Sequence, residues 1–118
     1  MEGRTVGDTI FGRILRREIP ADIVYEDERA LAFRDVAPQA PVHVLVIPKQ
    51  GMESLGDAVE ADSSLLGHLM WVAAEVARKE GIGDAFRVVT NSGAGAGQSV
   101  FHLHLHVIGG RPLKWPPG

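Results

Sequence analysis

Three histidines stand at alternate positions near the end of the chain, in the stretch "FHLHLHVI". They are His102, His104 and His106, with Leu103 and Leu105 between them. Because successive side chains of a β-strand point to opposite faces, a strand here would place the imidazoles on one face, at steps of about 6.5–7 Å, and the leucines on the other. An imidazole can bind a metal ion, transfer a proton or attack phosphorus as a nucleophile. The spacing therefore predicts a chemical site, with a set of half-buried structural histidines as the alternative.

A metal site is disfavoured by the same spacing. Along a straight strand the outer two histidines lie about 13–14 Å apart, which is too far for all three to reach one ion over bonds of about 2 Å. No Asp or Glu follows His106, so the carboxylate that some iron sites place shortly after a histidine pair is missing. The sequence therefore predicts no metal and no cofactor.

Nucleophilic attack by one of the rings fits the pattern better. If a backbone carbonyl accepts the Nδ1–H of the central ring, its Nε2 lone pair points outward, and the neighbouring imidazoles can donate to a phosphate or protonate a leaving group. The stretch "NSGAGAGQS", residues 91–99, precedes the histidines and can turn backbone N–H groups toward an anion. It lacks the Gly-Lys-Ser/Thr of a P-loop and leads into a strand, so a plain hairpin loop is the alternative.

The composition predicts a single domain over residues 1–118, with residues 1–7 flexible. A net charge of −3 argues against binding to DNA or RNA, because that binding neutralises phosphates with clustered Lys and Arg. The absence of cysteine excludes disulfides and cysteine nucleophiles. No apolar run is long enough for a membrane span or a secretory signal. We therefore expect a soluble, cytoplasmic protein that binds no membrane.

The hydrophobic pattern predicts five strands and two helices. Helices are expected over residues 8–20 and 63–80, where apolar residues recur at helical spacing. Strands are expected on both sides of the polar turn 26–29 and over residues 42–48, 85–91 and 100–108. Because the helices do not alternate with the strands, this order favours an α+β domain built on an antiparallel sheet. His43 would lie within a strand, as a core histidine or beside the other three, and His68 would be structural or solvated.

The pattern His-φ-His-φ-His-φ-φ, in which φ is apolar, resembles the signature of the histidine triad (HIT) superfamily of nucleotidyl hydrolases and transferases. The stretches "DTIFGRILRREIP", "PVHVLVIPK", "GQSVFHLHLHVIGGR" and "WPPG" are similar to its histidine triad nucleotide-binding (HINT) branch, and the resemblance covers most of residues 8–118. It implies a homodimer in which each subunit contributes a five-stranded antiparallel sheet. It also places the tail 111–118 near the dimer interface and the active site.

The resemblance further implies an enzyme that hydrolyses purine nucleoside 5'-phosphoramidates, such as AMP linked to an amine, through a covalent nucleotidyl-histidine. His104 would be the nucleophile, and the main chain of His102 would orient its ring. His106 would contact the phosphate. His43 would assist proton transfer, and Ser99 would hydrogen-bond near the scissile phosphorus and the leaving group.

A nucleotide site is implied in the same way. Asp35 would accept hydrogen bonds from the ribose hydroxyls, Asn91 would contact the phosphate side, and Gly97 and Gln98 would complete the phosphate loop with Ser99. Five apolar residues would line a base pocket, although their types fit a simple hydrophobic core equally well: Ile10, Phe11, Ile14, Phe33 and Val36.

Two features depart from the HINT branch. Gly51 stands where relatives often carry a histidine after "IPK", and residues 92–97 lack the acidic residues that are common in that loop. Within the superfamily, a dinucleoside polyphosphate hydrolase is the alternative. From other classes, the alternatives are a nucleotide-binding regulatory or scaffold protein with incidental hydrolysis, and a metal-binding module.

Overall fold

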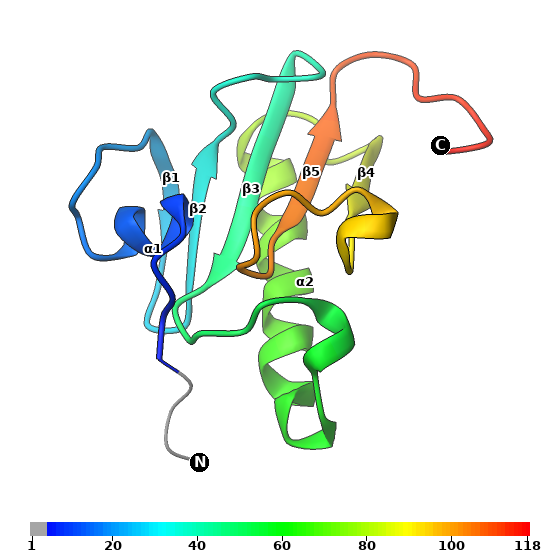
Figure 1. The fold of residues 1–118 in the computed structure, drawn as a ribbon. Helices are drawn as coiled ribbons and strands as arrows, with labels where there is room; N and C mark the ends of the chain where they lie inside the picture. The colour runs from blue at the N-terminus through cyan, green and yellow to red at the C-terminus, as the bar shows by residue number, and fades with distance from the viewer. Residues whose placement is uncertain (1–4) are drawn as a thin grey trace.

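The centre of the computed structural model, which describes residues 5–118, is a five-stranded antiparallel sheet in the order β1-β2-β3-β5-β4 (Figure 1). This confirms the predicted α+β class. Residues 1–4 of the segment predicted to be flexible lie outside the described residues. The strands are β1 (Ile23–Glu26), β2 (Ala30–Arg34), β3 (Val42–Pro48), β4 (Phe86–Val89) and β5 (Leu105–Gly109). The helices are α1 (Ile10–Leu15) and α2 (Ser63–Lys79), and three 3-10 turns occupy Leu55–Asp57, Glu60–Asp62 and Ala94–Ala96.

The turn between β1 and β2 is held by Asp27. Its Oδ1 accepts hydrogen bonds from the backbone N–H groups of Arg29 and Ala30, both at 2.8 Å. Its Oδ2 lies 2.6 Å from Nε2 of His68 on α2 and accepts a bond from the Tyr25 hydroxyl at 2.7 Å. His68 therefore joins the helix to the hairpin, which is the structural one of its two predicted roles.

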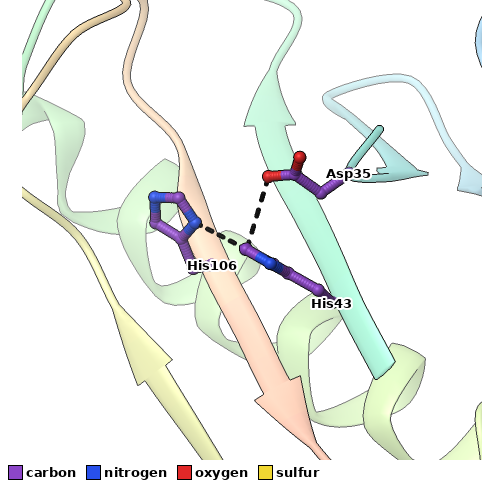
Figure 2. Close-up of side chains that lie close together, drawn as sticks. All are labelled: Asp35, His43 and His106. Atoms are coloured by element: carbon purple, nitrogen blue, oxygen red, sulfur yellow. Dashed lines mark hydrogen bonds and ion pairs between the residues drawn. The ribbon is translucent and has the colours of Figure 1, made fainter. Parts of the chain in front are cut away.

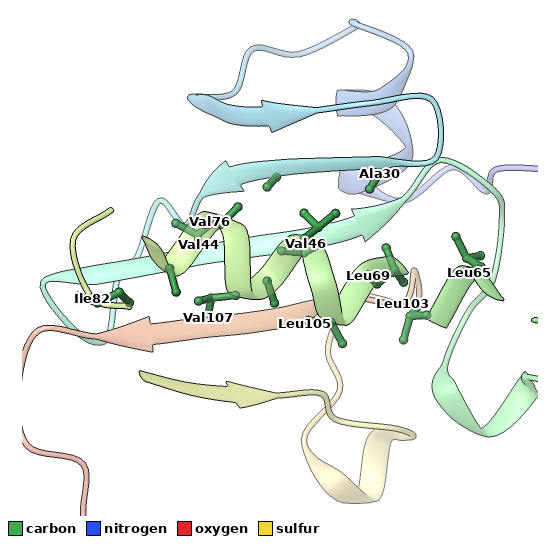
Figure 3. Packing of buried hydrophobic residues seen from close by; sticks show 14 of the residues in the cluster. Ala30, Val44, Val46, Leu65, Leu69, Val76, Ile82, Leu103, Leu105 and Val107 are labelled. Carbon is green, nitrogen blue, oxygen red and sulfur yellow. The ribbon is translucent and has the colours of Figure 1, made fainter. Parts of the chain in front are cut away.

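The main core lies between α2 and one face of the sheet, with α2 behind the sheet in Figure 1. Buried residues recur along the helix at the predicted spacing, and they meet side chains from β3 and β5 (Figure 3). The buried contacts comprise Leu65, Leu69, Val72 and Val76 from the helix, with Val44, Val46, Leu103, Leu105 and Val107 from the strands and the segment before β5. This layer covers the face of the sheet that carries no catalytic candidate.

The opposite face of the sheet packs against α1. Phe11 and Ile14 of the helix form a second buried cluster with the strand side chains that point to this face, namely Leu31, Phe33, Leu45 and Ile47. Because side chains alternate along a strand, His43 shares this face with Leu45, and the register places His106 opposite Leu45. The strand pattern therefore brings His43 and His106 together on the α1 side.

The last strand is shorter than predicted. Residues 100–108 were expected to be extended throughout, but β5 begins only at Leu105. Before it, the Leu103 N–H donates to the Met52 carbonyl at 2.7 Å and the Thr90 hydroxyl donates to the His104 carbonyl at 2.8 Å. These groups are bound by a loop and a side chain instead of by a strand ladder, so the predicted strand does not extend over His102 and His104. No helix within residues 5–118 combines the length and the apolar character that crossing a membrane requires.

Candidate active site

A cavity of about 320 Å³ opens on the α1 face of the sheet. Four of the polar residues singled out in the sequence line it: Asp35, Ser99, His104 and His106. The five residues predicted for the base pocket line it as well, namely Ile10, Phe11, Ile14, Phe33 and Val36. The structure thus gathers a polar group and an apolar group of side chains around one cavity.

Six further residues line the cavity, none of which was assigned to a site from the sequence: Ile19, Pro20, Ala21, Arg34, Leu45 and Val100. The alternation along β3 was a usable signal for Leu45, because it shares the face of His43. For Pro20 and Ala21 the sequence offered no signal, since they reach the cavity only through the path of the chain between α1 and β1.

His104 is buried, and its tautomer follows from one hydrogen bond. Its Nδ1 lies 2.8 Å from the main-chain carbonyl of His102. Because a carbonyl only accepts, the ring proton resides on Nδ1 and the Nε2 lone pair is left free. The Phe11 ring and the imidazole pack in a T-shaped arrangement, with centroids 5.0 Å apart at 84°. The residue therefore has a nucleophilic nitrogen and a fixed ring orientation at the cavity.

His43 links His106 to Asp35, as Figure 2 shows. Its Nε2 lies 2.9 Å from Nδ1 of His106 and 3.4 Å from Oδ2 of Asp35. Its Nδ1 accepts a hydrogen bond from the backbone N–H of Gln39 at 3.0 Å, so in the neutral ring the proton is on Nε2. His106 then accepts at Nδ1 and carries its own proton on Nε2. His106 is thereby set up as a donor, in contrast to His104.

The charge state of His106 follows from its surroundings. Burial, together with the neighbouring His104 and His43, lowers the pKa of His106 to about 4, against a smaller opposing effect of Asp35. The ring is consequently neutral at pH 7, in agreement with the tautomer derived from its contacts. Burial also lowers the pKa of His102.

His102 contributes its main chain and not its ring. Only 2% of the residue is exposed, its Nε2 lies 2.9 Å from the Pro48 carbonyl, and it is not among the residues that line the cavity. The expectation that its imidazole joins the other two at the site is therefore not met, because the ring binds the Pro48 carbonyl at the end of β3 instead. The implied orienting role belongs to its carbonyl oxygen.

The glycine-rich loop is held from inside by Gln98. The side chain is buried; its Oε1 accepts from the Gly93 N–H at 2.8 Å, and its Nε2 donates to the Glu53 carbonyl at 2.7 Å and the Val100 carbonyl at 3.0 Å. Gly93 and Gly97 have φ angles of 93° and 98°, which favour glycine. Asn91, Gly97 and Gln98 do not line the cavity, whereas Ser99 does. The structure therefore brings only the last residue of the predicted phosphate loop to it.

Close packing explains why a glycine stands at position 51. A Cβ at this position would lie 2.0 Å from the Thr5 carbonyl oxygen, because the segment before α1 passes directly over it. The departure from the HINT pattern thus coincides with a place where a side chain does not fit.

Asp35, His43 and His106 also form a set that could hold a metal ion, since one ligand atom from each lies within 4.8 Å of the others. Imidazole nitrogen and carboxylate oxygen are donors that suit zinc. This set differs from the three alternating histidines on which the prediction of no metal was based. An ion bound there would replace the hydrogen bond between His43 and His106.

Comparison with known proteins defines the class. Residues 16–113 match the HIT domain family, so the chain belongs to the HIT family. It is similar to a HIT family hydrolase of Legionella pneumophila, with a TM-score of 0.91 and 45% identity over 94% of this chain and 100% of that one. A HIT family hydrolase of Clostridium thermocellum gives a TM-score of 0.90 and 41% identity over 93% of this chain and 96% of that one. The fold is therefore that of HIT-family hydrolases.

Two relatives are similar in sequence. An uncharacterized HIT-like protein of Synechocystis is 64% identical over 111 residues, which are 94% of this chain and 97% of the relative. A 14 kDa zinc-binding protein of Zea mays is 52% identical over 112 residues, 93% of this chain and 88% of the relative.

Proposed function

We propose that this HIT-family protein belongs to the HINT branch and hydrolyses purine nucleoside 5'-phosphoramidates to a nucleoside monophosphate and an amine. The observation that carries the proposal is the hydrogen bond between Nδ1 of His104 and the His102 carbonyl, because it leaves a fixed, unprotonated Nε2 in a cavity that both polar and apolar side chains line. The similarity of longer stretches, such as "GQSVFHLHLHVIGGR" and "WPPG", to the HINT branch supports the choice of substrate.

In the first step the Nε2 lone pair of His104 attacks phosphorus, and the bond from phosphorus to the amine nitrogen breaks. The amine nitrogen keeps the bonding pair and takes a proton as it leaves. We assign the relay of this proton from solvent to the His43–His106 pair, and Ser99 hydrogen-bonds near the leaving group. The His104 ring, now bonded to phosphorus through Nε2, carries a positive charge that the His102 carbonyl stabilises. Donors that face the phosphoryl oxygens, among them Nε2–H of His106, stabilise the charge that develops there.

In the second step a water molecule attacks the same phosphorus. The bond from phosphorus to Nε2 breaks, the nitrogen recovers its lone pair, and the proton of the water is released. The nucleoside monophosphate leaves, and His104 returns to its initial tautomer. The two steps together consume one water and break one P–N bond, so no oxidant, reductant or cofactor is needed.

A direct assay tests this function. The purified protein is incubated with adenosine 5'-phosphoramidate or an AMP–amine conjugate, and AMP and amine are measured together. We expect equal amounts of both products, and slower cleavage of a dinucleoside polyphosphate. Preferential cleavage of the dinucleotide would instead favour the polyphosphate hydrolase, and tight AMP binding without turnover would favour the regulatory protein.

Asp35 is expected to bind the ribose. Asp35→Asn should raise KM for an AMP–amine conjugate about tenfold or more, because a hydrogen bond to a charged acceptor is lost. The same substitution should change KM little for the 2',3'-dideoxy conjugate, which lacks the hydroxyls that Asp35 would bind. Steady-state kinetics with both substrates measure the difference, and an equal change with both would contradict the ribose contact.

Turnover is expected to persist without metal. Treatment with excess EDTA followed by desalting should leave kcat unchanged, because each step uses only groups of the chain and water. Added Zn²⁺ should inhibit, since an ion on Asp35, His43 and His106 would displace the His43–His106 hydrogen bond. Loss of turnover with EDTA and recovery with Zn²⁺ would overturn the metal-free mechanism.

We further propose the homodimer that the resemblance implies. Among residues 5–118, β4 pairs with β5 on one side only, so its other edge can extend the sheet across two subunits. Met70 on α2 is 53% exposed, although large apolar side chains are usually covered. Light scattering after size-exclusion chromatography is expected to give twice the mass of 12.7 kDa.

A further inference from the structure

Arg111 lies just beyond β5 and reaches back to the loop between β2 and β3. Its Nε and Nη2 donate to the Gln39 carbonyl at 3.1 and 3.0 Å, while Nη1 donates to the Pro112 carbonyl at 3.0 Å. Two parallel donors on one acceptor fix both the position and the direction of that carbonyl, which a single ammonium group does not do. Gln39 is therefore anchored to the segment that follows the last strand.

The anchored residue is the one that sets the tautomer of His43. The N–H of Gln39 donates to Nδ1 of His43 at 3.0 Å, and Nε2 of the same ring faces His106 at 2.9 Å and Asp35 at 3.4 Å. Without the Gln39 donor, the neutral ring could place its proton on Nδ1. Nε2 would then become an acceptor facing Nδ1 of His106 and a carboxylate oxygen, which are acceptors themselves.

Within the described chain, the loop has few other attachments near this point. The Asp35 carboxylate accepts the Ala37 N–H at 2.8 Å, and the Gln39 side chain donates to the Ala37 carbonyl at 3.0 Å. Both bonds stay inside the loop, so they shape it without tying Gln39 to the sheet. Within residues 5–118, the paired hydrogen bonds from Arg111 are the contacts that tie Gln39 to a segment distant in sequence and outside the site.

We propose that Arg111 is a positioning residue, which acts through the Gln39 backbone to hold His43 with its proton on Nε2. Its effect on catalysis rests on the proposed function, whereas its effect on the His43 ring does not. Arg111 reaches no reacting atom in this scheme. It determines whether Nε2–H of His43 donates to Nδ1 of His106. When that bond is made, His106 carries its own proton on Nε2 and can donate from there.

The test compares Arg111→Met with Arg87→Met. Arg87 is the matched control, because its Nη2 donates to the Lys114 carbonyl at 3.0 Å and so also holds the C-terminal tail, but it does not touch Gln39. The ring nitrogens of His43 are observed by ¹⁵N NMR at pH 7.5. We expect the Nε2–H form in the wild type and in Arg87→Met, and a mixture of both tautomers in Arg111→Met. An unchanged Nε2–H form in Arg111→Met would overturn the proposal.

Kinetics give a second readout. In Arg111→Met we expect kcat with an AMP–amine conjugate to fall about tenfold while KM changes less than twofold, because a misplaced catalytic group slows the chemical step. In a His43→Ala background the same substitution should have no further effect. An equal additional loss in that background, or an equal loss in Arg87→Met, would show that Arg111 acts by another route.

If Arg111→Met does not fold, Arg111→Lys provides a second, more conservative variant for the same measurements. Lysine retains the positive charge but not the planar pair of donors, so we expect it to reproduce the tautomer mixture. Full recovery of the wild-type ring spectrum by lysine would contradict the role of the fork. Absence of phosphoramidate turnover in the wild type would refute the proposed function, and the NMR comparison would still decide the role of Arg111.

Discussion

Replacing His104 with asparagine is expected to abolish turnover of an AMP–amine conjugate, with a loss in kcat of about 10⁴-fold or more, as for other enzymes that lose their nucleophile. The asparagine amide can still donate to the His102 carbonyl, but its nitrogen lone pair is delocalised into the carbonyl group, so it does not attack phosphorus. Binding should persist, because the cavity keeps its apolar lining and Asp35. We expect the Kd for AMP to change by less than about threefold, since the lost ring is one contact among many.

Rapid quenching separates the nucleophile from a merely structural histidine. In the wild type, AMP should be recovered bound to the protein during the first turnover, and this adduct should be missing in His104→Asn. His68→Asn is the control, because His68 contacts Asp27 away from the cavity and should keep both the adduct and turnover. An adduct that survives in His104→Asn would assign the attack to another residue.

The sheet and the long helix could be predicted from the sequence because their signals are local. Apolar residues at helical spacing mark α2, and alternation along β3 assigns Val44 and Val46 to one face and His43 to the other. The hydrogen bond between Nδ1 of His104 and the His102 carbonyl could also be predicted, because the two residues are only two positions apart. Each of these features depends on short stretches of chain with a regular backbone.

The remaining features of the site depend on where loops pass. The ring of His102 binds the Pro48 carbonyl, and the side chain of Gln98 binds the Gly93 N–H within its own loop. Both partners are backbone groups that the path of the chain brings close, and no residue type marks them. The donor that fixes His43 is a backbone N–H of Gln39, a group that every residue except proline has. No pattern of residue types distinguishes it, so only the folded chain reveals the contact.

The lowered pKa of His106 predicts how stability depends on pH. In the unfolded chain a histidine takes up a proton near pH 6.5, whereas in the folded protein His106 does so only near pH 4. Between these values the unfolded state binds more protons, so the free energy of unfolding falls as the pH falls. The loss begins below about pH 6.5 and is complete below about pH 4. Burial of His102 acts in the same direction, because it also lowers the pKa of that ring.

We expect the free energy of unfolding to drop by about 2 kcal/mol between pH 7.5 and 4.5, a value that allows for the partial exposure of His106. Urea unfolding at a series of pH values measures this change. In His106→Asn, which has no titrating ring at this position, the same curve should be flatter. Arg87→Met leaves every histidine and carboxylate of the chain in place, so its curve should follow the wild type. A wild-type slope in His106→Asn would mean that other groups cause the acid sensitivity, and that the pKa of His106 lies closer to 6.5 than its half-buried position beside two other imidazoles implies.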